Sequence, residues 1–190
     1  MNLPNKLTVA RIMMTPFFIL FLAIGSVGAR ICALVIFLAA SLTDLWDGVI
    51  ARRSGQITSF GKLMDPLADK LIICAAFISF AGMRDMGIPA WPVVLIVTRE
   101  IIITDMRKEA LRGSRVIDAS KAGKYKTTVQ IVVIVIILLL SILKGLRVTE
   151  KLPYYLVLFT MLLTVYSGAE YILNNKRVFL AELKEDKDGV

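Results

Sequence analysis

The sequence predicts an all-α integral membrane protein, built as one domain over residues 1–190 from a bundle of six transmembrane helices. Apolar residues make up 57% of the chain and the mean hydropathy is +0.73, which is more apolar than soluble domains of this size. Six separate apolar stretches approach the roughly 20 residues that a helix needs to cross a membrane. One compact bundle would therefore use nearly the whole chain.

The expected spans begin and end at residues typical of helix boundaries. Pro4, Pro89 and Pro153 precede spans, where proline is tolerated, while Gly25 and Gly82 follow them, as is common at helix ends. The spans that we expect are 8–26, 30–51, 63–83, 88–107, 126–145 and 153–174, followed by a cytoplasmic tail at 175–190.

Lysine and arginine collect on one side of the predicted membrane. Short cytoplasmic loops carry the basic excess of membrane proteins, and the segments 52–62 and 107–126 hold many of these residues. Both termini, and a cavity between the helices, are therefore expected at the cytoplasmic face of the cell membrane. The net charge of +8 favours anionic lipids or phosphorylated substrates as partners. Nucleic acid is not expected, because the basic residues occupy short loops between apolar stretches.

Four aspartates interrupt the apolar pattern in the stretch TDLWDGVIARRSGQITSFGKLMDPLADK, residues 43–70. An ionised side chain near the middle of a spanning helix costs roughly 2.5–3.5 kcal/mol. Asp44 and Asp47 are three residues apart, and Asp65 and Asp69 are four apart, so each pair lies on one helix face. The short intervening loop predicts antiparallel neighbouring helices, with both pairs directed into one cavity that opens to the cytoplasm.

Carboxylates that converge in this way repel one another unless they take up protons or gather cations. The chain contains no histidine, and oxygen ligands without imidazole or thiolate favour Mg²⁺ or Mn²⁺. A site for two metal ions, about 3.5–4 Å apart, is the expected partner. The alternative is a set of solvated carboxylates paired with Arg52, Arg53, Lys62 and Lys70, but two face-matched pairs across one hairpin argue against it.

The spacing around the aspartates is that of a known family. Read from Asp44, the chain gives D-x-x-D-G-x-x-A-R, then eight residues, then G-x-x-x-D-x-x-x-D from Gly61 to Asp69. This pattern resembles, without departure, the signature of the CDP-alcohol phosphatidyltransferase family. The resemblance implies a six-helix membrane enzyme that requires divalent metal, usually as a homodimer. It would displace CMP from a CDP-linked lipid with the hydroxyl group of a second alcohol.

The resemblance also implies roles for individual positions. All four aspartates are implied as metal ligands, and Asp69 also as the proton acceptor. The implied CDP-lipid site comprises Gly48, Ala51, Arg52, Thr58 and Gly61. Phosphoryl transfer depends mainly on positioning and charge neutralisation, which metals and an arginine fork supply. For the glycines taken alone, close helix packing is the simpler explanation.

Basic residues near the cytoplasmic ends of the fourth and fifth spans are the candidates for binding the acceptor alcohol. A phosphate could be bound by Arg99, Arg107, Lys124 and Lys126, since the two arginines lie within about two helical turns on a similar face. The alternative for Arg99 is an ion pair with Glu100, or across helices, that stabilises the bundle.

Three flanking stretches, NLPNKLTVARI, REIIITDMR and GKYKTT, resemble those of bacterial phosphatidylglycerophosphate synthases within the family. This resemblance implies CDP-diacylglycerol as donor and sn-glycerol 3-phosphate as acceptor. Other acceptors remain alternatives, namely inositol phosphate, serine or phosphatidylglycerol. An intramembrane prenyltransferase or a cation or proton transporter could also carry membrane carboxylates, but neither explains the glycine and arginine spacing.

Polar residues in the first and last spans have simpler interpretations. Thr8 and Arg11 could form the rim of a lipid site or belong to an amphipathic anchor. Ser167, Glu170 and Tyr171 are best explained by hydrogen bonds between helices.

Overall fold

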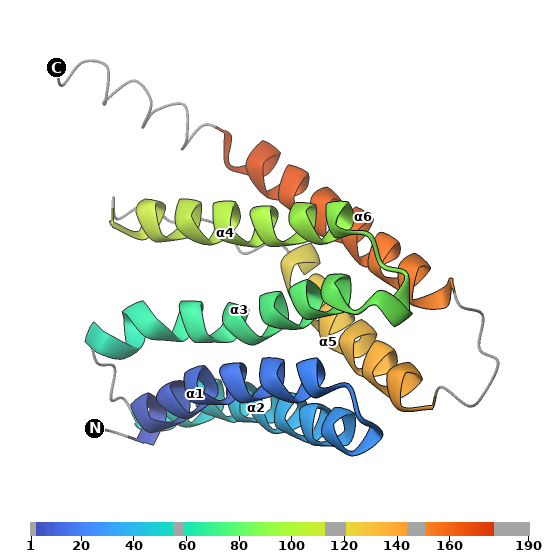
Figure 1. The fold of residues 1–190 in the computed structure, drawn as a ribbon. Helices are drawn as coiled ribbons and strands as arrows, with labels where there is room; N and C mark the ends of the chain where they lie inside the picture. Colours follow the sequence, from blue (N-terminus) through green and yellow to red (C-terminus); the bar gives the residue numbers. More distant parts are fainter. Residues whose placement is uncertain (1–2, 55–58, 113–120, 144–150, 177–190) are drawn as a thin grey trace, which may run out of the picture.

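The computed structural model describes residues 3–54, 59–112, 121–143 and 151–176, with side chains for 7–43, 68, 70–106, 125–143 and 151–176. Within these ranges the chain is helical apart from short turns, and it contains no β-strand (Figure 1). The elements are α1 (Leu3–Ile24), α2 (Val27–Ser54), α3 (Ser59–Gly82), the 3₁₀ helix η1 (Arg84–Met86), α4 (Ala90–Arg112), α5 (Lys121–Ile142) and α6 (Leu152–Asn174).

Each expected span coincides with one of the six α-helices, so the predicted all-α class is confirmed. The helix ends differ from the expected ends by no more than five residues. The differences of five residues are at the start of α1, the end of α4 and the start of α5. There the helix continues into polar sequence that hydropathy alone assigns to a loop.

Some of the described helices are long and apolar enough to cross a membrane, which favours a membrane protein. Within the described residues, three stretches qualify by length and composition: Leu7–Ile24, Tyr125–Ile142 and Leu152–Asn174. Val27–Thr43 and Lys70–Gly82 are shorter apolar stretches. These two stretches belong to α2 and α3, whose remaining turns carry the aspartate motif.

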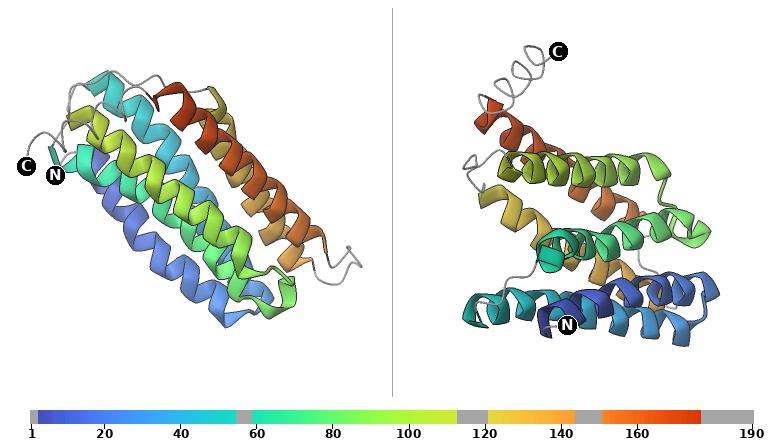
Figure 2. Two further views of the ribbon diagram at one scale, coloured as in Figure 1. Left: turned by 90° about the horizontal axis from the view of Figure 1, so that it is seen from above. Right: turned by 90° about the vertical axis from the view of Figure 1, so that its left-hand side faces the viewer.

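The helices pack so that α2 and α3 are held apart by their neighbours. α2 and α3 run antiparallel, as expected, but contact each other only slightly, whereas α1 and α5 each pack against both of them. α4 packs on α3 and α6, and α6 also lies along α5. Figure 2 shows α5 and α6 side by side along one flank of the bundle. The expected hairpin therefore depends on α1 and α5 for its geometry.

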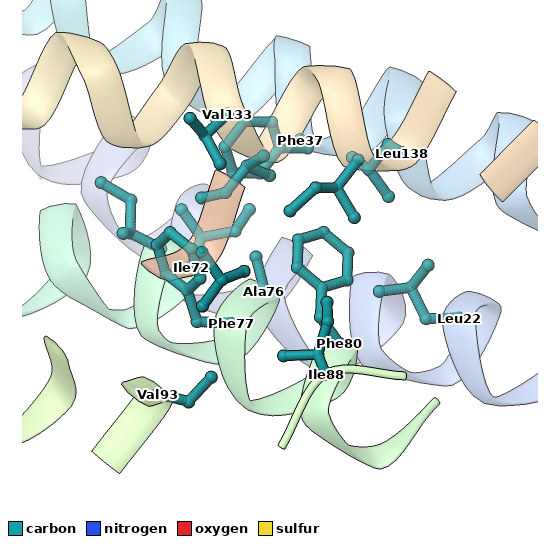
Figure 3. Packing of buried hydrophobic residues seen from close by; sticks show 14 of the residues in the cluster. Leu22, Phe37, Ile72, Ala76, Phe77, Phe80, Ile88, Val93, Val133 and Leu138 are labelled. Atoms are coloured by element: carbon teal, nitrogen blue, oxygen red, sulfur yellow. The ribbon is translucent and has the colours of Figure 1, made fainter. Parts of the chain in front are cut away.

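Aliphatic and aromatic residues form the core between α1, α2, α3 and α5, with contributions from α4 and α6 (Figure 3). The rings of Phe18 and Phe37 have centroids 6.0 Å apart, and those of Phe77 and Phe80 meet edge to face at 6.4 Å. Such pairs contribute about 0.5–1.5 kcal/mol each beyond the area that they bury. Ala76, fully buried beside them, leaves room for these rings.

Arg30 joins three elements at the end of the bundle opposite the aspartate helix turns. Its Nη1 donates a hydrogen bond to the Ser141 carbonyl oxygen at 2.7 Å, and its Nη2 pairs with Asp85 at 2.8 Å. Ser141 lies in the last turn of α5, where carbonyl groups lack partners within the helix. Arg30 is buried, so the start of α2 is tied to both α5 and η1.

We expect Arg30→Met to lower the stability of the detergent-solubilised protein by about 2 kcal/mol, because the buried hydrogen bond to the Ser141 carbonyl oxygen and the ion pair with Asp85 are both lost. The measurement is thermal unfolding followed by circular dichroism. Arg84→Gln is the control: Arg84 is exposed, and such surface changes alter stability by less than about 0.5 kcal/mol. Equal melting temperatures for both variants would contradict the role of Arg30.

Candidate functional site

Both acidic pairs lie within continuous helix. Asp44 and Asp47 belong to α2, and Asp65 and Asp69 to α3, so the helical spacing on which their shared faces were predicted is confirmed. The two segments lie at the same end of the bundle, beside the connection from α2 to α3 (Figure 1). The four side chains lie outside the described part of the structure, and their convergence stays a prediction.

The other described motif positions lie in the same two helices. Gly48, Ala51 and Arg52 lie in the last turns of α2, and Gly61 lies in the first turn of α3. Thr58 falls outside the described residues. The described motif positions therefore lie in the later turns of α2 and the first turns of α3.

The chemistry of the acidic residues fits divalent metal. Among the described side chains, no group of three or more histidine, cysteine or acidic residues could hold an ion. The aspartates of α2 and α3 supply four carboxylates in a chain without histidine, and hard oxygen donors of this kind suit Mg²⁺ or Mn²⁺.

A buried carboxylate, Glu100 of α4, gathers cationic and polar side chains from the neighbouring helices. Lys126 of α5 forms an ion pair and a hydrogen bond with its Oε1, and Gln130 donates to the same oxygen at 3.2 Å. Arg99 Nη1 lies 3.6 Å from Oε1, and Lys70 Nζ of α3 lies 3.9 Å from Oε2. We call these five residues the Glu100 cluster.

α6 closes the Glu100 cluster from the other side. Ser167 Oγ accepts a hydrogen bond from Arg99 Nη2 at 3.1 Å, and Thr164 Oγ1 accepts one from Gln130 at 3.4 Å. The expected helix-to-helix hydrogen bonding of Ser167 is therefore confirmed. Gly168 completes the contact, because a Cβ atom there would lie 3.0 Å from Arg99 Nε.

Two of the four residues predicted to bind the acceptor's phosphate lie together in this geometry, and their role in binding stays a prediction. Arg99 and Lys126 come together around Glu100, although they are on different helices. The alternative, a mutual or cross-helix ion pair of Arg99 and Glu100, is confirmed by the contacts of Glu100 with Arg99 and with Lys126. Phosphate binding and a stabilising ion pair are compatible, because the cluster has three cations and one carboxylate. The side chains of Arg107 and Lys124 lie outside the described part of α4 and α5.

Sequence reasoning missed several members of the cluster. The sequence pattern pairs Lys70 only with solvated aspartates, and it predicts no role for Gln130 or for its partner Thr164. A signal was present: Lys126 and Gln130 are four apart just before a long apolar run, and so share a helix face. Choosing their partner, however, requires the helix packing.

Polar residues of α1 are also buried near this end of the bundle. Thr8 and Arg11 are 1% and 2% exposed, and Thr15 donates to the Arg11 carbonyl oxygen at 3.1 Å. An amphipathic anchor would leave its polar face in water, so that explanation is wrong for these residues. They belong to the interior of the bundle.

Comparison with known proteins identifies the family. A family model described as CDP-alcohol phosphatidyltransferase matches residues 1–175. The chain belongs to the CDP-alcohol phosphatidyltransferase family. It is thus a transferase of a family that generally uses divalent metal ions, and membership excludes the prenyltransferase and transporter interpretations.

Several bacterial relatives match this transferase over most of their length. A CDP-diacylglycerol--glycerol-3-phosphate 3-phosphatidyltransferase of Bacillus subtilis (strain 168) is 35% identical, with 92% of this chain and 95% of the relative covered. A probable phosphatidylglycerophosphate synthase of Mycobacterium tuberculosis (strain ATCC 25618 / H37Rv) is 40% identical, with 90% and 80% covered. A relative of Rickettsia felis, named as the first, is 34% identical, with 94% and 97% covered.

We expect Gly168→Ala to destabilise the transferase by about 1–3 kcal/mol, because the new methyl group overpacks against Arg99. Gly28→Ala is the matched control, since Gly28 is also helical and nothing lies within 4 Å of its added Cβ. Alanine there should be neutral or stabilising by about 0.5–1 kcal/mol. Thermal unfolding in detergent measures both, and a Gly168→Ala protein as stable as Gly28→Ala would contradict the predicted overpacking.

Proposed function

We propose that the protein transfers the phosphatidyl group of CDP-diacylglycerol to sn-glycerol 3-phosphate, giving phosphatidylglycerol phosphate and CMP. The observation that carries this proposal is the match, over at least 90% of the chain, to relatives whose names state this reaction or its product. The Glu100 cluster supports it, because a net positive buried cluster suits a phosphorylated acceptor better than serine.

We propose that the chain forms one domain with six crossings of the cell membrane, both termini being cytoplasmic. The alternation of six helices and the basic residues in the loops on one side support this topology. The CDP-lipid would enter from the cytoplasmic leaflet with its acyl chains remaining in lipid. A homodimer is proposed from the family resemblance.

In this proposal Asp44, Asp47, Asp65 and Asp69 hold two Mg²⁺ ions, with Mn²⁺ as an alternative. Metal ions bound there would neutralise the charge that develops on the pyrophosphate during transfer. Arg52 would bind the phosphates through its planar fork. Gly48, Ala51 and Gly61 would let the nucleotide approach the backbone closely, and Thr58 would contact it from the loop.

Asp69 is the proposed proton acceptor. Its carboxylate takes the proton of the attacking hydroxyl group of glycerol 3-phosphate. The acceptor oxygen then forms a bond to the phosphorus that carries diacylglycerol. The bond from that phosphorus to the CMP oxygen breaks, and CMP leaves with the electron pair. The acceptor's own phosphate would be bound by Arg99, Arg107, Lys124 and Lys126.

We expect the purified protein, with CDP-diacylglycerol and Mg²⁺, to release CMP much faster with sn-glycerol 3-phosphate than with inositol phosphate, serine or phosphatidylglycerol. A site that binds an acceptor through buried charged groups rejects an alcohol that leaves those groups unpaired, by factors up to about 10⁴. The assay follows CMP by chromatography and the lipid product by mass spectrometry. A higher kcat/KM with another alcohol would identify that alcohol, and not sn-glycerol 3-phosphate, as the acceptor.

We expect Asp69→Asn to lower kcat by about 10²–10⁴-fold, the usual contribution of a positioned general base. Asp105→Asn is the matched control, because Asp105 is an exposed carboxylate on α4 outside the motif, and it should turn over at the normal rate. Stopped assays of CMP release at saturating Mg²⁺ measure both variants. Ordinary turnover by Asp69→Asn would remove it from the proton-transfer step.

A further inference from the structure

Glu100 has no role in the assignments above, yet it is the centre of the buried polar cluster between α3, α4, α5 and α6. Its side chain is 3% exposed and contacts cations from three helices. We infer that Glu100 is a positioning residue for the phosphorylated acceptor, which holds the charged ends of Arg99 and Lys126 close together. This inference rests on the proposed acceptor site.

The burial of Glu100 calls for an explanation beyond stability. Removing a carboxylate and an ammonium group from water costs several kcal/mol per ion, and well-packed apolar residues often stabilise a protein as well or better. Glu100 and Lys126 are both 3% exposed on the side chain, so each depends on the other to offset this cost. The pair therefore supplies a fixed arrangement of charge that apolar side chains could not.

The carboxylate of Glu100 is itself held in place. Gln130 donates to Oε1 and also to Thr164 of α6, so the amide links the carboxylate to two further helices. Oε1 also accepts a hydrogen bond from Lys126 Nζ and lies 3.6 Å from Arg99 Nη1. Because one oxygen serves both cations, it keeps two like charges near each other against their repulsion.

The charge of the cluster matches a phosphate monoester. Lys70, Arg99 and Lys126 carry three positive charges against the one negative charge of Glu100, which leaves a net charge of +2. A phosphate monoester carries about −1.5 to −2 at pH 7. Arg99 and Lys70 are the more accessible cations, with side chains 12% and 28% exposed against 3% for Lys126.

An effect of total charge and an effect of positioning would change acceptor binding in opposite directions in Glu100→Gln. If the cluster acted only through its total charge, the variant would gain one positive charge and bind the acceptor more tightly. If Glu100 positions the cations, Arg99 and Lys126 lose their common partner and separate, and the acceptor binds more weakly. The direction of the change in KM therefore decides between the two.

We expect Glu100→Gln to raise the KM for sn-glycerol 3-phosphate by about tenfold or more, the equivalent of about 1.4 kcal/mol. The KM for CDP-diacylglycerol should change less than about twofold, because that lipid binds elsewhere. Glu100→Asp keeps the charge and should recover much of the lost affinity. Asp85→Asn is the control: it weakens a different ion pair, that of Arg30 with the partly exposed Asp85, and should lower stability without changing either KM.

Gln130→Leu provides a second test if Glu100→Gln does not fold. This substitution removes the hydrogen bond from Gln130 to the Glu100 carboxylate but leaves the charge of Glu100 in place. We expect it to raise the acceptor KM by about threefold, which corresponds to the loss of one hydrogen bond. An unchanged or lower acceptor KM in either folded variant would overturn the positioning role.

A binding measurement separates this inference from the proposed reaction. Stabilisation of the solubilised protein by sn-glycerol 3-phosphate, measured by thermal shift, does not depend on turnover. If the wild type is stabilised and Glu100→Gln needs more ligand for the same shift, the positioning role stands, even if CMP release reveals a different acceptor. If both proteins shift alike, or the wild type is not stabilised at all, the positioning role is wrong.

Discussion

Charged side chains inside an apolar bundle must find partners within the protein, because a membrane offers no water to solvate them. The structure meets this constraint at both ends of the helices. Arg30 binds Asp85 and the end of α5 at one end. Towards the other end, Glu100 binds Lys126. Each pairing joins helices that are distant in sequence, so the need to neutralise charge also fixes how the helices pack.

The apolar core between these ends determines where the aspartate helices lie. α2 and α3 barely contact each other, and α1 and α5 pack against both. The buried phenylalanines, such as Phe18 and Phe37, therefore help to set how far apart α2 and α3 lie, although they are outside the aspartate motif. Packing of this density transmits small changes, so substitutions far from the motif can change the geometry of the helices that carry it.

The proposed acceptor and metal sites are coupled through α3. Asp69, the proposed proton acceptor, is followed directly by Lys70, whose ammonium group lies 3.9 Å from Glu100 Oε2. A rigid helix thus carries the proposed base and one member of the cationic cluster on adjacent residues. Holding both on one element favours a defined distance between the attacking hydroxyl group and its base, on which proton transfer depends.

The helices, the family and the aspartate motif can be predicted from the sequence, because hydropathy and motif spacing are local properties. The partners of Glu100 and Arg30 cannot, since Lys126, Gln130 and Ser141 are placed by helix packing rather than by sequence spacing. Sequence could identify Arg99 as an unusual charge in an apolar span, but its contacts with Ser167 and Gly168 arise between helices whose register and tilt depend on every neighbour at once.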